Sequence, residues 1–515
     1  MAIQQQKAEN QPFWSFHSIR LRMAVMLALG MAVHALLRGV LGMALVCMVK
    51  SPNYHVESME NETGSYTVTP NYFQVAWNMR EISAIFMFFY AGTFLSVFAA
   101  HYFVMKFGPK LIISWGIAIC ILSTWALPFV IYLTPVYIIT SLLRFITGLA
   151  QGFYIPCCSL LISKWFRESE KSTAMAIFTT GNQIGLAISM YCTAELCKID
   201  FMSGWPLAFL AYGLLGLIFL TLWLPFASDR PRQSPQITAI ELSTIRSQVG
   251  ASQTLITNGQ QQYTPYSKLL FSPVILAICL SSFCQSFVTV AMTSYLPEFN
   301  RSALGLSLQQ NALWSAMPFA IHFISKLIFG FVADYAKSKE VDVDVVTKIS
   351  NTISSFGCAV CLVLIGYVDQ PITMLVLLCA SLSLTAGYVP GYNTSIVCIA
   401  PMFTAAISAY AQGFAQVASI LAPIAVGFIT EESTLDEWIN VFRVLAGILI
   451  ITGVVFLIFG SAKLQSWARP AMTTTTSGQH GPIIRPVSVE RPLGSGSIIQ
   501  TATMALIEEE EISEQ

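Results

Sequence analysis

The chain has 515 residues, of which 55% are hydrophobic and 10% are charged. A soluble globular domain carries about 25% charged residues, so this composition excludes that class and indicates a protein that crosses a lipid bilayer many times. The formal net charge is zero and no basic stripe runs along the chain, which excludes nucleic acid as a partner.

Long apolar runs follow one another along most of the chain. A helix that spans a bilayer needs about 20 mainly apolar residues. Runs of this size form two groups of six on either side of a polar segment, which suggests an internal repeat. We therefore predict an all-α membrane protein with twelve transmembrane helices in two six-helix bundles. The predicted spans cover residues 23–49, 79–104, 110–132, 136–162, 172–193, 204–226, 270–297, 308–334, 347–368, 371–398, 404–430 and 437–461.

Lys and Arg residues concentrate on one side of the predicted membrane, as in the loops 106–110 and 164–172, and the loops on the other side are acidic. Basic residues favour the cytoplasmic side, so we expect both termini in the cytoplasm. A glycosylation sequon at Asn61 lies in the first loop on the other side, and a second one at Asn300 lies closer to a helix end. The predicted parts are a cytoplasmic N-terminus (1–22), an N-terminal bundle (23–226), a cytoplasmic linker (227–268), a C-terminal bundle (269–461) and a disordered cytoplasmic tail (462–515).

Twelve cysteines are present, and most of them, including Cys47, lie inside apolar runs. We expect these to be small packing residues. No set of four Cys and His residues with the spacing of a zinc site appears, so no metal site is predicted. Cys192 and Cys197 lie near a membrane edge and are close enough in sequence to be considered as a disulfide pair.

Arg38 lies about 22 Å into the first span. A charge at this depth costs at least a few kcal/mol unless it faces a protein-lined cavity or pairs with another group. No carboxylate within a predicted span is an obvious partner, so we expect Arg38 to be an anion ligand in a central cavity, and a structural ion pair is the alternative. His34, one turn earlier, is expected to be a packed or hydrogen-bonded histidine rather than a proton relay.

The fourth span contains the stretch "RFITGLAQGFYIPCC", in which Arg144 lies about 12 Å from the outer end. Thr147, Gly148 and Gln151 follow at i+3, i+4 and i+7 and share its face of the helix. A stripe of polar and small residues suits the wall of a water-filled path. The alternative is a helix contact made possible by Gly148 and Gly152, and the two can coexist.

Three polar residues in the second half have more than one interpretation. Gln285, in the middle of the seventh span, can bind either a substrate or a neighbouring helix. Asn393 lies near Gly387 and Pro390 in the tenth span, where we expect a hinge, a gate or a simple kink. Lys326 in the eighth span is expected to snorkel toward the cytoplasmic end.

Several segments, in the same order along the chain, resemble the anion:cation symporter family of the major facilitator superfamily. This family includes vesicular glutamate transporters, sialin and type I sodium–phosphate cotransporters. The resemblance covers residues 20–465 and implies the major facilitator fold, alternating access and anionic substrates. It also implies that Arg38 and Arg144 contact the substrate, because they fall on arginines of the family's first and fourth spans. The segments are "SKWFRESEKS", "SPQITAIEL", "YLPEF", "FGFVADYAKSK", "GYNTSIVCIAP" and "LDEWINVF".

The departures from the family pattern concern proton coupling and substrate. Thr147 and Gln151 stand where proton-coupled relatives have acidic residues, and Ser159 stands where they have a histidine. Gln285 replaces the arginine of the glutamate transporters. The chain is therefore most similar to the phosphate and organic-anion branch, and glutamate and sialic acid are disfavoured as substrates.

The expected function is secondary active transport of organic anions or phosphate, and the alternative is a sensor or channel-like anion conductance derived from the same fold. The sequence has no GxxxxGK[ST] motif and no catalytic constellation, which argues against an ATP-driven pump and against an enzyme. We expect no cofactor beyond a co-transported Na⁺ or H⁺. The expected partners are a small anion and the bilayer, for a monomer in the plasma membrane or in a vesicular or lysosomal membrane. The predicted substrate contacts are Arg38, Arg144, Gln151, Gln285 and Asn393.

Overall fold

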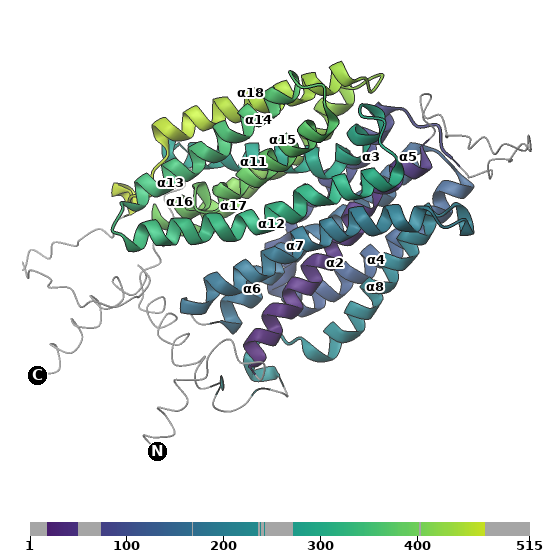
Figure 1. Cartoon of the computed structure of the whole chain (residues 1–515). Coiled ribbons are helices and arrows are strands. Elements are labelled where there is room, and N and C mark those ends of the chain that lie inside the picture. The colour runs from purple at the N-terminus through teal and green to yellow at the C-terminus, as the bar shows by residue number, and fades with distance from the viewer. Residues whose placement is uncertain are drawn as a thin grey trace, which may run out of the picture.

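The computed structural model describes residues 18–49, 74–166, 168–234, 237, 241–242, 271–400 and 403–468. Within these ranges the regular elements are helices, and the long ones lie side by side (Figure 1). They are α2 (Ile19–Met48), α3 (Met79–Phe107), α4 (Pro109–Leu133), α5 (Tyr137–Gly152), α6 (Tyr154–Trp165), α7 (Glu168–Cys197), α8 (Trp205–Phe226), α11 (Pro273–Ser302), α12 (Leu308–Ser338), α13 (Val343–Thr352), α14 (Cys358–Ile365), α15 (Pro371–Leu384), α16 (Tyr392–Cys398), α17 (Thr404–Ile429) and α18 (Leu435–Phe459), with the short helices η1 (Phe201–Ser203), η2 (Pro231–Gln233), η3 (Ile353–Gly357), η4 (Thr385–Tyr388) and η6 (Ser466–Ala468).

Twelve crossings can be traced through these elements. The helices α5 and α6 together form the fourth crossing, α13, the π-helix η3 and α14 form the ninth, and α15, η4 and α16 form the tenth. Eleven crossings are long and apolar enough to span a membrane. The remaining one, α7, has 30 residues but a more polar sequence. The predicted all-α fold in two bundles is confirmed, and eleven of the twelve predicted spans have the length and composition of a membrane helix. The predicted linker and tail lie largely outside the described residues.

Local sequence signals set several helix ends. Asn78 before α3 and Ser307 before α12 each accept the backbone N–H of the residue three positions later, and that residue's side chain returns a bond, as in a capping box. Gly108 has a φ of 81° and Pro109 begins α4, so the chain leaves α3 and enters α4 through a single residue.

Helix packing reveals the internal repeat. In the first bundle, α2 packs on α7, α3 on α5, and α4 on α8. The corresponding helices of the second bundle make the corresponding pairs, α11 with α17, α12 with α15, and α14 with α18. Between the bundles, α3 packs on α17 and α7 packs on α12, and these two pairs are also equivalent. The structure therefore consists of two bundles that repeat one helix arrangement.

We call the face where α2 begins and α18 ends the terminal face, and the other side the opposite face. At the terminal face, Arg20 is 1% exposed and bonds the carboxylates of Glu170 on α7 and Glu241 of the linker, at 2.5 and 3.2 Å. Breaking a buried pair of this kind typically costs about 3–5 kcal/mol. This network anchors the start of the linker to the first bundle.

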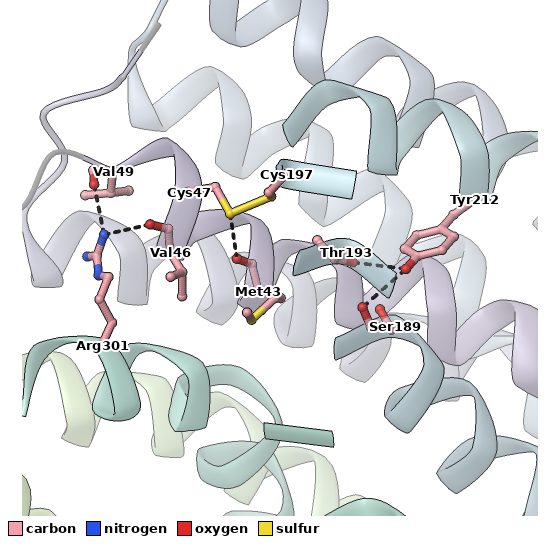
Figure 2. The surroundings of a disulfide bond; sticks show 9 residues. All are labelled: Met43, Val46, Cys47, Val49, Ser189, Thr193, Cys197, Tyr212 and Arg301. Carbon is pink, nitrogen blue, oxygen red and sulfur yellow. Dashed lines mark hydrogen bonds between the residues drawn. A yellow bond between two sulfur atoms is a disulfide. The ribbon is translucent and has the colours of Figure 1, made fainter. Parts of the chain in front are cut away.

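At the opposite face the bundles are bonded to each other (Figure 2). Arg301 on α11 donates to the carbonyl oxygens of Val46 and Val49 at the end of α2, at 3.1 and 2.9 Å. Tyr295 on the same helix donates to Ser83 on α3 at 2.9 Å. These bonds close the opposite face.

A disulfide joins Cys47 on α2 to Cys197 on α7 at the same face (Figure 2). The suggested pairing of Cys192 with Cys197 is therefore wrong, and so is the packing role expected for Cys47. Cys192 and Cys197 lie on one helix, about 7.5 Å apart along its axis and on different sides of it, which is too far for a disulfide. Cys192 is a free thiol.

The structure describes one of the two glycosylation sequons, the one at Asn300. Asn61 lies outside the described residues. Asn300 is fully buried, and its amide donates to Asn311 at 3.3 Å and to Ser315 at 3.0 Å. A sugar cannot be attached to Asn300 in this fold, so its sequon is a chance match.

Candidate functional site

The residues predicted in the first bundle meet where α5 crosses α2. Arg144 on α5 donates to the carbonyl oxygens of Leu37 at 3.5 Å and Arg38 at 3.2 Å. Two turns farther along α5, Gln151 donates to the carbonyl oxygen of His34, one turn before Arg38 on α2, at 3.3 Å. Three predicted substrate contacts, Arg38, Arg144 and Gln151, are thus brought together.

Arg38 is the residue of this group that has accessible surface. From Val33 to Leu45, a stretch that is described throughout, Arg38 is the only residue that is not buried. Its Nη2 donates to Oδ1 of Asn182 on α7 at 2.8 Å. Because α2 packs against α7, α8 and α11, we infer that the accessible part of the Arg38 side chain faces the protein interior rather than lipid. The predicted role of Arg38 as an anion ligand in a central cavity stays a prediction.

Arg144, in contrast, is buried, with 2% of its surface exposed. Its guanidinium carbon lies 5.3 Å from the centre of the Phe89 ring on α3, within the range of a cation–π contact. Arg144 therefore stands between α2 and α3, bound to carbonyl oxygens and to an aromatic face. In this arrangement its guanidinium binds the backbone of α2 at Arg38.

Neither arginine is neutralised within the described part of the protein. No ion pair there involves Arg38 or Arg144, and the Nε atom of each is buried without a hydrogen-bond acceptor. A buried donor normally finds a partner, and two positive charges in a low-dielectric surrounding attract an anion far more strongly than they would in water. The region therefore carries positive charge and N–H donors that no described group of the protein satisfies.

Glycines on α5 form a separate contact with α3. A Cβ atom at Gly148 would lie 2.0 Å from the backbone oxygen of Phe89, and one at Gly152 would overlap the Ser96 hydroxyl. Only glycine allows the two backbones to approach this closely. The interpretation as a helix contact is therefore correct, because the glycines pack on α3 while Arg144 and Gln151 bind α2. The predicted wall of a water-filled path is not seen along this stripe, since Arg144 and Thr147 are both buried.

His34 is buried and packs its ring on Tyr154, with 4.0 Å between ring centres. Neither ring nitrogen has a hydrogen-bond partner in the part of the chain that the structure describes. Of the two expected states, packed or hydrogen-bonded, the packed one is correct.

Gln285 and Asn393 lie together in the second bundle. Tyr392 on α16 donates to the amide oxygen of Gln285 on α11 at 2.5 Å, and the amide of Asn393 donates to the carbonyl oxygen of Tyr388 at 3.3 Å. Both amides are half-buried. The tenth crossing is broken here, since η4 and a turn separate α15 from α16, as the Gly387, Pro390 and Gly391 pattern predicted.

Sequence reasoning missed Asn182. This residue holds Arg38 from α7, which is the most polar crossing. The signal was present in "TTGNQIGLAIS", where two adjacent amides stand in the middle of a span. An amide that fixes a charged ligand at this depth is expected to be functional.

The profile of the Major Facilitator Superfamily matches residues 27–406. The chain belongs to this superfamily. It is 31% identical over 417 residues to the Caenorhabditis elegans "Uncharacterized transporter slc-17.3", covering 79% of this chain and 76% of the relative.

Two further relatives indicate the branch. A Drosophila melanogaster protein named "Putative inorganic phosphate cotransporter" is 25% identical over 488 residues, covering 91% of each chain. The human vesicular glutamate transporter 2 is 26% identical over 454 residues, covering 88% of this chain and 75% of the transporter. These relatives belong to the SLC17 family, so the resemblance to the anion:cation symporters is confirmed, and the family is one of transporters rather than enzymes.

Solved structures show the same fold. A D-xylose–proton symporter superposes with a TM-score of 0.63 at 14% identity, over 87% of this chain and 99% of that chain. A bacterial homologue of the lysosomal transporter Spinster gives a TM-score of 0.62 at 12% identity, over 86% of this chain and 97% of the other. These similarities establish the two-bundle architecture of a superfamily transporter.

Proposed function

We propose that this protein is a secondary active transporter of small organic anions or inorganic phosphate. The observation that carries the proposal is the pair Arg38 and Arg144, two adjacent cations with no described carboxylate partner and with unpaired N–H donors. The fold supports alternating access between two repeated bundles. The relatives named for phosphate and glutamate transport support an anionic substrate.

We further propose that the terminal face is cytoplasmic and that the protein works as a monomer in the plasma membrane or in a vesicular or lysosomal membrane. Disulfides persist in oxidising compartments, so the Cys47–Cys197 bridge supports an extracellular or luminal opposite face. The excess of Lys and Arg in the loops of the other face supports the same orientation. Treatment with a glycosidase should increase the gel mobility of the parent but not of Asn61→Gln.

The test is uptake into proteoliposomes that contain the purified full-length protein. A panel of phosphate, dicarboxylates and monocarboxylates is measured with and without Na⁺ and at two pH values, which identifies the coupling ion as well as the substrate. Arg38→Gln and Arg144→Gln should each lower uptake at least tenfold, the effect of losing about 1.4 kcal/mol. Arg80→Gln, which changes an exposed arginine at the opposite face, should have little effect.

Folding and mechanism are checked in the same preparation. Each variant should elute as a single species and melt near the parent temperature in detergent. A carrier accelerates uptake of labelled anion when unlabelled anion is present on the other side of the membrane, whereas a channel-like conductance or a sensor does not. Normal uptake by both Arg38→Gln and Arg144→Gln would contradict the proposed site.

A further inference from the structure

Lys326 lies on the face of α12 that points into the protein. The exposed side chains Ile324, Ile328 and Phe331, at 53%, 56% and 74%, mark the stripe of α12 that faces lipid. With about 100° of rotation per residue, Lys326 lies roughly opposite that stripe. It shares its own stripe with His322, which is buried.

The expected snorkelling of Lys326 is wrong for this geometry. Lys326 is eight residues before Asp334, where the predicted eighth span ends, which corresponds to about 12 Å along the helix. A side chain of four methylene groups cannot cover that distance, and its direction is away from lipid. Asp334, closer to the terminal face, is paired with Lys337 at 3.4 Å instead.

Lys326 has no bonding partner within the described part of the protein. The ion pairs found there in the second bundle join Arg301 to Glu298, Lys337 to Asp334, Lys348 to Asp344 and Lys463 to Asp342. His322, one turn away, directs its Nδ1 to the carbonyl oxygen of Leu382 at 2.7 Å and leaves the ammonium of Lys326 unbonded. An unpaired ammonium deep inside a membrane protein is costly and marks a functional site by default.

The helix that carries Lys326 packs on the helix that binds Arg38. Figure 1 shows α12 running beside α7, and the two helices pack on each other across the bundle interface. The Asn182 side chain that holds Arg38 belongs to α7. Lys326 is thus a cation of the second bundle on a helix that packs against α7, the helix whose Asn182 binds Arg38.

We propose that Lys326 is the second bundle's cationic contact for the transported anion. This inference rests on the proposed function. A carrier that alternates between two faces has to hold its substrate from both bundles, and the other predicted contacts of the second bundle, Gln285 and Asn393, are neutral. With Arg38 and Arg144, Lys326 makes three cations without described carboxylate partners. Such a set fits a dianion, such as phosphate or a dicarboxylate, better than a monocarboxylate.

Uptake kinetics in proteoliposomes test the proposal with Lys326→Gln, Lys326→Arg and the control Lys348→Gln. Lys348 lies on the next helix and pairs with Asp344 near the terminal face at 3.8 Å. Lys326→Gln should raise the half-saturating concentration of phosphate about tenfold or more, with a smaller change for lactate, and the control should match the parent. Lys326→Arg should recover most of the parent affinity, which a purely structural role would not require.

A second measurement uses the parent protein and so does not depend on how the variants fold. An amine-reactive reagent is applied with and without phosphate, and modification of Lys326 and Lys348 is quantified by mass spectrometry. Phosphate should protect Lys326 and leave Lys348 unchanged. Absence of protection, or parent-like phosphate kinetics in a folded Lys326→Gln, would overturn the inference. If the Arg38 and Arg144 variants lose uptake, such a result contradicts the role of Lys326 and leaves the proposed function intact. If the parent transports no anion, the proposed function is contradicted as well.

Discussion

Replacing Arg301 should open the opposite face of the protein. Arg301, on α11 of the second bundle, donates to the carbonyl oxygens of Val46 and Val49 on α2 of the first bundle at 3.1 and 2.9 Å. It also pairs with Glu298 at 2.7 Å, and both of these side chains are buried. The bonds to α2 join different bundles, so they can exist only while this face is closed.

The size of the effect follows from these two bonds. A hydrogen bond from a charged donor contributes about 1.5–3 kcal/mol, so together they favour the closed face by about 3–6 kcal/mol. At 1.4 kcal/mol per factor of ten, their loss should shift the closed-to-open ratio by about 100-fold to 10,000-fold. Arg301→Gln alone also leaves Glu298 buried without its partner, so the double variant Glu298→Gln/Arg301→Gln isolates the bonds to α2.

Cysteine labelling measures this shift. Thr293 on α11 is buried, and its backbone packs against Gly42 of α2, so Thr293→Cys should react with a membrane-impermeant maleimide only when the face opens. Adding the pair Glu298→Gln/Arg301→Gln should speed labelling strongly. The control Arg80→Gln removes an exposed ion pair with Glu431 at the same face, worth about 0–1 kcal/mol, and should change the rate less than about fivefold. Equal labelling rates in the two backgrounds would refute the assigned role.

Three other substitutions test separate parts of the structure. Gly148→Ala would place a Cβ atom 2.0 Å from a backbone oxygen of α3 and should lower the melting temperature in detergent through an overpacking cost of about 1–3 kcal/mol, whereas Gly413→Ala, with nothing within 4 Å, should not. Cys47→Ser should remove about 2–4 kcal/mol of stabilisation and make the melting temperature insensitive to reductant, and Cys192→Ser should do neither. Asp342 has a pKa below its usual value, because its carboxylate accepts a backbone N–H of α13 and pairs with a lysine. The ionised carboxylate stabilises the start of α13 at neutral pH, and this stabilisation is lost as the pH falls through the lowered pKa. The protection of the first-turn amides of α13 against exchange, relative to an unstructured peptide at the same pH, should therefore fall below about pH 4 in the parent but not in Asp342→Asn.

The helical architecture could be predicted because it depends on the number and length of the apolar segments in the sequence. Twelve apolar runs of membrane-spanning size leave few alternatives to two six-helix bundles, and charge placement gives an orientation that stays a prediction. The break in the tenth crossing could also be predicted, since Gly387, Pro390 and Gly391 disfavour a regular helix.

Contacts between helices could not be predicted in the same way. Periodicity places Arg144 and Gln151 on one face of α5, but it does not say that this face meets the backbone of α2 or that Arg144 is buried there. The Cys47–Cys197 bridge depends on which helix ends meet in space, and the sequence suggested a nearer partner.

Lys326 was misassigned for a different reason. Its place eight residues before Asp334 in the sequence indicates a position near the cytoplasmic end of the span, whereas the side of the helix on which it lies decides its surroundings. The apolar positions at 324, 328 and 331 define the lipid stripe in the sequence itself, and Lys326 falls opposite that stripe.

The uncompensated charges of Arg38 and Arg144 bear on how voltage acts on the transport cycle. A unit charge that moves through the full membrane field changes energy by about 2.3 kcal/mol per 100 mV. The unloaded protein carries two such charges on α2 and α5 without described carboxylate partners, and the dianion proposed as substrate would offset the charge of these two side chains. Any displacement of these helices relative to the field would therefore do electrical work in the empty protein and almost none in the loaded one. A transient current that disappears on addition of phosphate would be the electrical signature of these two side chains.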